Sequence, residues 1–93
     1  ALVLEPTANP YWNPVHSPQE EPARHAVLHR TMRALAAADP EHVSVADVTG
    51  WLDVVGLAED HATRPDGVHW SPAASRRLAD DYLGPLLVAA ALR

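Results

Sequence analysis

The sequence contains no cysteine and no lysine, and its longest uninterrupted apolar run has only seven residues, Leu86 to Leu92. Without cysteine the chain can form neither a disulfide framework nor a thiolate metal site. All seven basic residues are arginines scattered along a chain of net charge −5, so nothing predicts a surface for nucleic acid. A membrane-spanning helix needs roughly 20 apolar residues, and the run of seven is far too short.

The composition is that of an ordinary globular protein, with 47% hydrophobic and 20% charged residues in a chain of 93. A chain of this length is one domain at most, and small domains leave a large share of their surface exposed. The sequence starts at Ala1 without an initiator methionine or a signal-peptide pattern. We therefore expect it to be processed or excised from a longer polypeptide.

The order of the predicted elements is strand, helix, strand, helix. Residues 1–5 (ALVLE) and 42–48 (HVSVADV) have the unalternating apolar composition of strands buried on both faces of a parallel sheet. Between them, Ser17 and Pro18 predict a helix start and Glu20 completes a capping box. This order predicts a right-handed parallel crossover, with the helix ending near residues 39–40.

Helical spacing predicts which side of each helix is apolar. In the first helix one side carries Val27, Leu28, Thr31, Met32, Leu35 and Ala38. Residues 49–67 read as a mostly irregular connection with one helical turn around Trp51 to Val55. Ser71 and Pro72 then predict the start of the last helix, with an apolar stripe of Ala74, Leu78 and Tyr82. Pro85 must kink or restart that helix because it removes a backbone hydrogen bond.

Two parallel strands buried on both faces do not make a stable sheet by themselves. We therefore expect the remaining strands to lie on a missing N-terminal part or on a partner chain. In this interpretation residues 1–93 are one segment of a single domain, and the apolar strands need their neighbours to avoid edge pairing and aggregation.

The segment RPDGVHWSPAAS, residues 64–75, places Asp66 three residues before His69 and just ahead of a helix start. A histidine general base needs one ring nitrogen free for a serine hydroxyl while a carboxylate holds the other N–H. Gly67 gives the turn the backbone freedom to bring the two side chains together. On spacing alone, however, an Asp-Gly turn with a packed or solvated histidine is the simpler interpretation.

The wider segment RPDGVHWSPAASRRLADDYLGPLL resembles the last conserved block of the SGNH hydrolases, the GDSL esterase and lipase family. The resemblance implies an α/β fold, in which the chain is the C-terminal β-α-β-α portion of a three-layer α/β/α flavodoxin-like domain with a parallel sheet. It implies Asp66 as the triad carboxylate and His69 as the general base, with no metal or organic cofactor. The same phrase is similar both to SGNH domains appended to bacterial membrane acyltransferases that modify cell-surface glycans and to stand-alone esterases. An extracytoplasmic or secreted location is favoured over a cytoplasmic one.

The rest of the family's site is not present in the sequence. There is no G-D-S block and no match for the glycine and asparagine of the oxyanion hole, and four serines (Ser17, Ser44, Ser71 and Ser75) are poor substitutes for the nucleophile. The resemblance therefore implies an ester hydrolase or O-acyltransferase acting on a small acyl ester or acylated glycan, with its serine on the N-terminal half of the domain, which is either a missing segment or a separate partner chain. The alternative is a non-catalytic interaction module, a degenerate remnant of the same fold.

Other residues carry weaker hypotheses. Tyr11 and Trp12, in the proline-rich loop after the first strand, are candidates to line an acyl or sugar pocket, or else pack on the domain's own surface. His25 and His29 have helical metal-ligand spacing, but their flank beside Arg33 favours a solvated face. A mixed site of His61 with Asp66 and His69 lacks a supporting motif. Asp47, after the second predicted strand, is interpreted as a turn cap rather than a catalytic acid.

Overall fold

The computed structural model describes residues 1–9, 12 and 21–92. Over these residues the elements follow one another as β1 (Leu2–Val3), α1 (Pro22–Ala38), β2 (Val45–Ala46), α2 (Val48–Val54), α3 (Pro72–Leu78), the π-helical turn η2 (Ala79–Leu83) and α4 (Gly84–Ala91). Helix α1 begins at Pro22, and the predicted capping residues Ser17 and Glu20 lie outside the described residues. No helix in the described ranges is both long enough and apolar enough to cross a bilayer.

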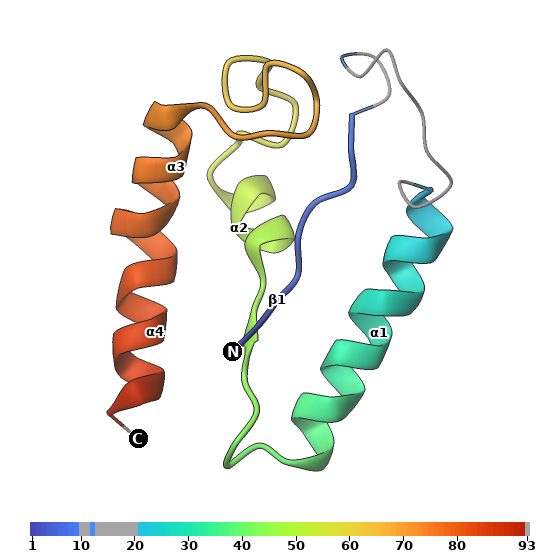
Figure 1. Cartoon of the computed structure of the whole chain (residues 1–93), viewed down its shortest axis with the longest axis vertical. Helices are drawn as coiled ribbons and strands as arrows, with labels where there is room; N and C mark the ends of the chain where they lie inside the picture. Colours follow the sequence, from blue (N-terminus) through green and yellow to red (C-terminus); the bar gives the residue numbers. More distant parts are fainter. Residues whose placement is uncertain (10–11, 13–20, 93) are drawn as a thin grey trace.

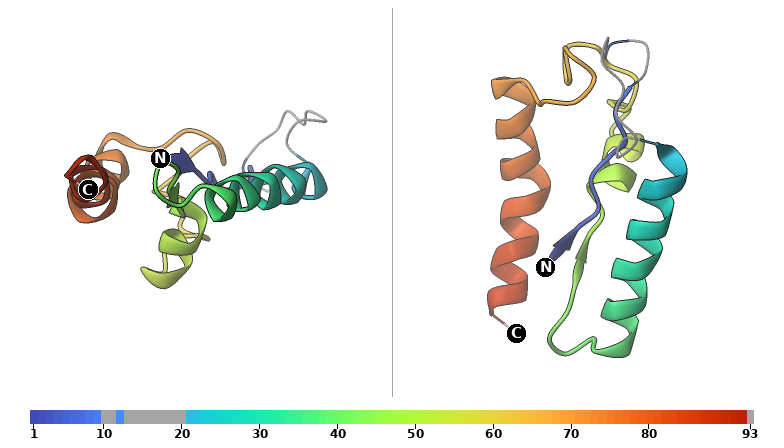
Figure 2. Two further views of the ribbon diagram at one scale, coloured as in Figure 1. Left: turned by 90° about the horizontal axis from the view of Figure 1, so that it is seen from below. Right: turned by 45° about the vertical axis from the view of Figure 1, so that its right-hand side comes forward.

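The two strands pair in parallel, as the sequence predicts. Leu2 lies opposite Val45, and the backbone N–H groups of Leu2 and Leu4 donate to the carbonyls of Ser44 and Ala46 at 2.7 and 2.9 Å. Figures 1 and 2 show the strands between α1 on one side and the continuous helix α3–η2–α4 on the other. The chain is therefore a small, helix-rich domain built on a two-stranded parallel sheet.

The second strand is shorter than predicted, because Asp47 ends it. The expected strand 42–48 forms only at Val45–Ala46, and Val48 is already the first residue of α2. The Asp47 carboxylate accepts a hydrogen bond from the Gly50 N–H at 2.9 Å, so it is the N-cap of α2. This confirms Asp47 as a cap and explains why the predicted single helical turn is a helix of seven residues.

Tyr82 connects this cap to the last helix. Its hydroxyl accepts a hydrogen bond from the Asp47 N–H at 2.8 Å, and its ring stacks on Trp51 with centroids 5.9 Å apart. The stripe predicted for the last helix is thus confirmed at Tyr82 and at Ala74, which is buried. The described core is small and consists of Leu4, Ala46, Val48, Leu52 and Ala74.

The predicted interruption at Pro85 takes the form of the π-helical turn η2. Here the Gly84 N–H donates to the carbonyl of Ala79, five residues earlier, and α4 then starts with Pro85 in its first turn. A Cβ at position 84 would lie 2.5 Å from the Ala79 oxygen, so this close approach requires glycine. At the other end, the Ser71 hydroxyl accepts from the Ala74 N–H at 3.2 Å, as the predicted cap should.

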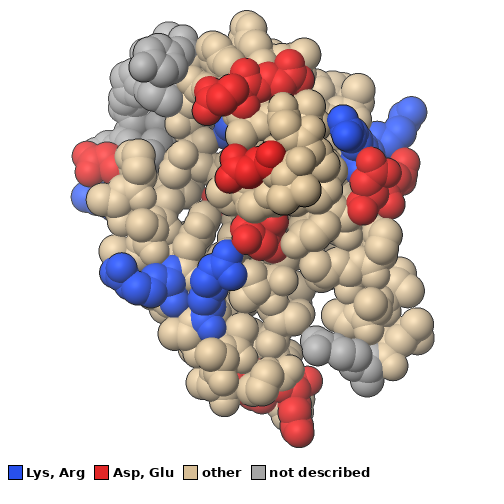
Figure 3. All heavy atoms as spheres, turned by 180° about the vertical axis from the view of Figure 1, so that it is seen from behind, with Lys and Arg blue, Asp and Glu red and all other residues tan. Residues whose placement is uncertain are grey.

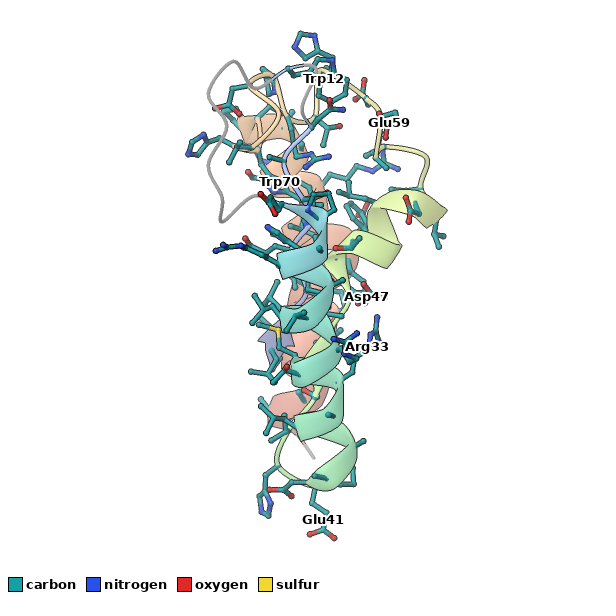
Figure 4. All side chains as sticks on the ribbon, turned by 90° about the vertical axis from the view of Figure 1, so that its right-hand side faces the viewer. Trp12, Arg33, Glu41, Asp47, Glu59 and Trp70 are labelled. Atoms are coloured by element: carbon teal, nitrogen blue, oxygen red, sulfur yellow. The ribbon has the colours of Figure 1, made fainter. Side chains whose placement is uncertain are left out.

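The face of α1 that points inward was predicted incorrectly. Val27, Leu28 and Leu35 are 52%, 51% and 54% exposed, although the apolar pattern places them toward the core. The less exposed side carries His25, His29, Met32 and Ala36, so the two histidines are not on a solvated face. In this orientation of the helix, Arg33 forms an ion pair of 2.8 Å with Asp47 (Figure 4).

The apolar side of α1 points away from Arg33. Arg33 points toward Asp47 at the start of α2 (Figure 4), and on a regular helix Leu28 and Leu35 lie about 140° and 160° from it. Because Leu2 and Leu4 bond to β2, the backbone groups of Val3 point away from β2. In the described part of the chain, this edge of β1 has no neighbouring strand.

Charged side chains of both signs alternate on one face of the molecule. On the face drawn in Figure 3, arginine and acidic residues lie in small separate groups. Two of the ion pairs among the described residues join Arg33 to Asp47 at 2.8 Å and Arg77 to Asp81 at 3.5 Å.

Candidate acid-base site

The predicted pair lies in the long connection between α2 and α3, at the end of the molecule where both strands terminate (Figure 1). In parallel α/β sheets this carboxyl edge is the usual position for ligands and reacting groups. The turn itself is anchored by buried polar residues, since Thr63 and Arg64 are only 3% and 4% exposed. Ser71, the cap of α3, donates its N–H to the Thr63 carbonyl at 2.9 Å and so fixes the far end of the connection.

The structure brings Asp66 and His69 into direct contact. One carboxylate oxygen of Asp66 accepts from the backbone N–H groups of Val68 and His69 at 2.9 and 2.7 Å. The other oxygen lies 2.6 Å from His69 Nδ1. The turn needs Gly67, whose φ of 78° lies in the left-handed region.

This geometry decides which ring nitrogen of His69 is available. The pKa of Asp66 is held down at about 2, chiefly by the hydrogen bond from His69 and then by the N–H groups of Val68 and His69. An ionised carboxylate can only accept, so Nδ1 carries the proton and donates it to Asp66. The imidazole is 85% exposed, which leaves Nε2 accessible as a proton acceptor.

The low pKa of Asp66 gives a direct prediction for titration. Carbon-13 NMR of the Asp66 carboxyl should show a midpoint near 2, and His69→Ala should raise it because the largest stabilising contact is lost. Since the folded pKa lies below the ordinary value of about 4, Asp66 stabilises the fold above that pH. This contribution disappears as the pH falls from about 4 to about 2. An unchanged midpoint in His69→Ala would contradict the pairing.

A groove of about 600 Å³ runs beside His69. Its walls come from the end of β1, from the residues flanking His69, and from one side of α3 and η2; they are Glu5, Val68, Trp70, Ser75, Leu78, Ala79 and Leu83. Most of this lining is apolar. The Ser75 hydroxyl shares the groove with His69, but no hydrogen bond joins these two described side chains.

The two aromatic residues proposed as substrate contacts have different outcomes. Tyr11 lies outside the described residues. Trp12 is half-buried and packs against His61, with ring centroids 4.9 Å apart, at the same end of the molecule as Glu59 (Figure 4). It is not among the residues that line the groove beside His69, and its contact with substrate stays a prediction.

The histidines do not assemble a metal site in the described ranges. His61 Nε2 donates to the Pro65 carbonyl at 2.7 Å, so this nitrogen is already engaged. The rings of His25 and His29 meet edge to face with centroids 6.0 Å apart. Within residues 1–9, 12 and 21–92, no three His, Cys, Asp or Glu side chains gather closely enough to hold a metal ion.

A second pair of the same spacing, absent from the sequence-based predictions, lies at the other end of the molecule. Asp39 and His42 in the α1–β2 connection also follow D-x-x-H, and their side chains meet at 2.9 Å. A short distance between the two side chains is therefore not specific to a catalytic pair. The Asp66–His69 pair differs in its position at the carboxyl edge, its groove and the two backbone N–H groups that fix its carboxylate.

Arg64 and Asn9 were also not predicted. Both are polar side chains buried behind the Asp66 turn, and nothing in their local sequence marks them, because burial here depends on contacts between distant segments. Only the position of Arg64 directly before Pro65 and Asp66 could have drawn attention to it.

Comparisons with protein-family models, curated proteins and solved structures find no match for this chain.

Proposed function

We propose that this chain supplies the acid and base of a Ser-His-Asp triad in an SGNH-type ester hydrolase or O-acyltransferase. The observation that carries the proposal is the contact of 2.6 Å between Asp66 and His69 Nδ1. The rest of the imidazole, which includes Nε2, is exposed beside a mostly apolar groove. A carboxylate that fixes the tautomer and an accessible Nε2 are what a histidine general base requires.

The proposed reaction has two proton transfers at His69 Nε2 in each of its two halves. In the first half this nitrogen removes the proton of a serine hydroxyl as the serine oxygen attacks the ester carbonyl, and it then protonates the departing alcohol. In the second half the same nitrogen deprotonates water or an acceptor alcohol as it attacks the acyl-serine, and it returns a proton to the serine oxygen as the acyl–serine bond breaks. Asp66 stabilises the imidazolium that forms in each half of the reaction, and the steps need no metal or organic cofactor.

The serine is proposed to come from polypeptide outside these 93 residues. Ser75 lies in the groove, but its place inside α3 and the absence of a bond to His69 argue against it. Two features support the addition of further strands and helices: the edge of β1, which has no neighbouring strand in the described part of the chain, and the exposed Leu28 and Leu35 on α1. The chain would then be the C-terminal β-α-β-α portion of a flavodoxin-like α/β/α domain.

The substrate proposed for this site is a small acyl ester or an acylated glycan. The apolar lining of the groove supports an acyl group next to His69, and Trp12 offers a ring near the same end of the molecule.

The test compares the complete domain, meaning this chain together with the preceding segment of its polypeptide, with the 93 residues alone. We expect the complete domain to hydrolyse p-nitrophenyl acetate and to be inactivated by a fluorophosphonate, which labels activated serines. The labelled residue should lie outside this chain, and Ser75→Ala should keep full activity. Labelling of Ser75 would contradict the assignment of the nucleophile.

The open edge also favours a second candidate, a non-catalytic interaction module. Val27, Leu28 and Leu35 on α1, and Val88 on α4, are more than half exposed, as expected of surfaces that a partner covers. This candidate predicts that the complete domain neither hydrolyses the ester nor reacts with the fluorophosphonate, although it is folded.

A further inference from the structure

Arg64 is a buried cation directly behind the turn that carries Asp66. Its side chain is involved in two hydrogen bonds, from Nη1 to the Thr7 carbonyl at 2.7 Å and from Nη2 to the Ala58 carbonyl at 3.2 Å. Its own carbonyl accepts from the Gly67 N–H at 2.8 Å. Arg64 therefore connects the Asp66 turn to the segment that follows β1 and to the start of the loop after α2.

A second bond ties the same two segments together. The Asn9 N–H donates to the Gly67 carbonyl at 2.9 Å, and the buried Asn9 side chain donates to Glu59 at 3.2 Å. The segment after β1 thus holds the turn at two points, Thr7 with Arg64 and Asn9 with Gly67. By contrast, the Asp66–His69 contact is internal to the turn and does not fix where the turn lies relative to the sheet.

We infer that Arg64 is a positioning residue that sets the distance between His69 Nε2 and the attacking serine. The inference rests on the proposed function, in which the serine arrives on polypeptide that adds to the sheet at β1. The histidine and the serine can meet only if the turn is held in a fixed place relative to β1, and Arg64 with Asn9 provides that connection. A displacement of about 1 Å at a reacting group can lower the rate about 100-fold.

The chemistry of arginine suits this role. A guanidinium presents N–H groups in several fixed directions, so it can bind carbonyls of two different segments at once, whereas a lysine ammonium has no such planar fork. Burial is costly for a cation and lowers the pKa of Arg64, an effect that the charge of Glu59 opposes. The two carbonyls match Nη1 and Nη2 of this buried cation, whereas its Nε is buried without a hydrogen-bond partner in the described part of the chain.

The test uses Arg64→Lys and Arg64→Met in the complete domain, with Arg77→Met as the control. Arg77 is an exposed arginine on α3 whose one ion pair among the described residues is with Asp81, so its loss should not alter the rate. We expect kcat for p-nitrophenyl acetate to fall about 100-fold in Arg64→Met and about 10-fold in Arg64→Lys, with KM nearly unchanged. The pH profile of kcat/KM should keep its shape, because Asp66 and His69 still form their pair.

Amide hydrogen exchange provides a readout that does not depend on activity. In both Arg64 variants the Asn9 and Gly67 amides should exchange faster, while the Val68 and His69 amides, bound to Asp66, keep their protection. Unchanged exchange at Asn9 and Gly67 would overturn the connection. Faster exchange with a wild-type kcat would overturn the positioning role. If the unmutated domain hydrolyses no ester, the proposed function fails, and the positioning role of Arg64 fails with it. The exchange result still shows whether Arg64 holds the Asp66 turn to the segment after β1.

Discussion

His69→Ala in the complete domain is expected to lower kcat for p-nitrophenyl acetate by about 10⁵- to 10⁶-fold, to the residual rate that substrate binding and oxyanion stabilisation provide. The side chain is 85% exposed and its only described hydrogen bonds involve Asp66, so its removal should leave the fold intact. The measurement is steady-state hydrolysis, with circular dichroism to confirm that the variant is folded.

The chain offers a matched control for this variant. His42→Ala removes an exposed imidazole that also bonds to an aspartate three residues earlier, but at the opposite end of the molecule. We expect His42→Ala to retain the wild-type rate. Substantial activity in a folded His69→Ala domain, or an equal loss in both variants, would exclude His69 as the general base.

Asp66→Asn is expected to lower kcat by about 10⁴-fold. The amide oxygen of asparagine can still accept from the Val68 and His69 N–H groups, so the turn should keep its shape. What is lost is the negative charge 2.6 Å from His69 Nδ1, which holds the tautomer and stabilises the imidazolium. An amide in its place can present its own N–H to Nδ1 and move the ring proton to Nε2, the nitrogen that must accept.

Two comparisons separate charge from turn structure in this variant. Asp66→Ala loses the backbone contacts as well and should release the Val68 and His69 amides to exchange, unlike Asp66→Asn. Asp39→Asn, the matched change in the distant pair, should have no effect on the rate. If Asp66→Asn is as active as the wild type, the carboxylate has no part in the reaction and the pair is a structural turn.

The features that could be predicted from the sequence are those decided by neighbouring residues. The cap at Ser71, the restart at Pro85 and the contact between Asp66 and His69 each depend on groups within a few positions of one another. The parallel pairing of the strands followed from the order of elements, which restricts the connections that a chain can make.

The features that could not be predicted depend on distant contacts. Asp47 caps α2 locally, and this cap ends a strand that composition alone extended to residue 48, whereas its ion pair with Arg33 joins two separate elements. Helix α1 is oriented so that Arg33 reaches Asp47, and Leu28 and Leu35 of its apolar pattern are exposed instead of packing in the described core. Arg64 is fixed by carbonyls from Thr7 and Ala58, which no periodicity brings together.

The π-helical turn η2 makes the length of the last helix a determinant of its packing. Such a turn holds one residue more than an α-helical turn, and one residue corresponds to about 100° of rotation. Leu86 and Ala90 line a pocket together with Val45 of the second strand and the preceding Ser44. A single deletion within residues 79–83 would leave the composition of α4 unchanged and yet turn a different side of it toward the sheet, so the register of this helix depends on the number of residues before it as much as on its own sequence.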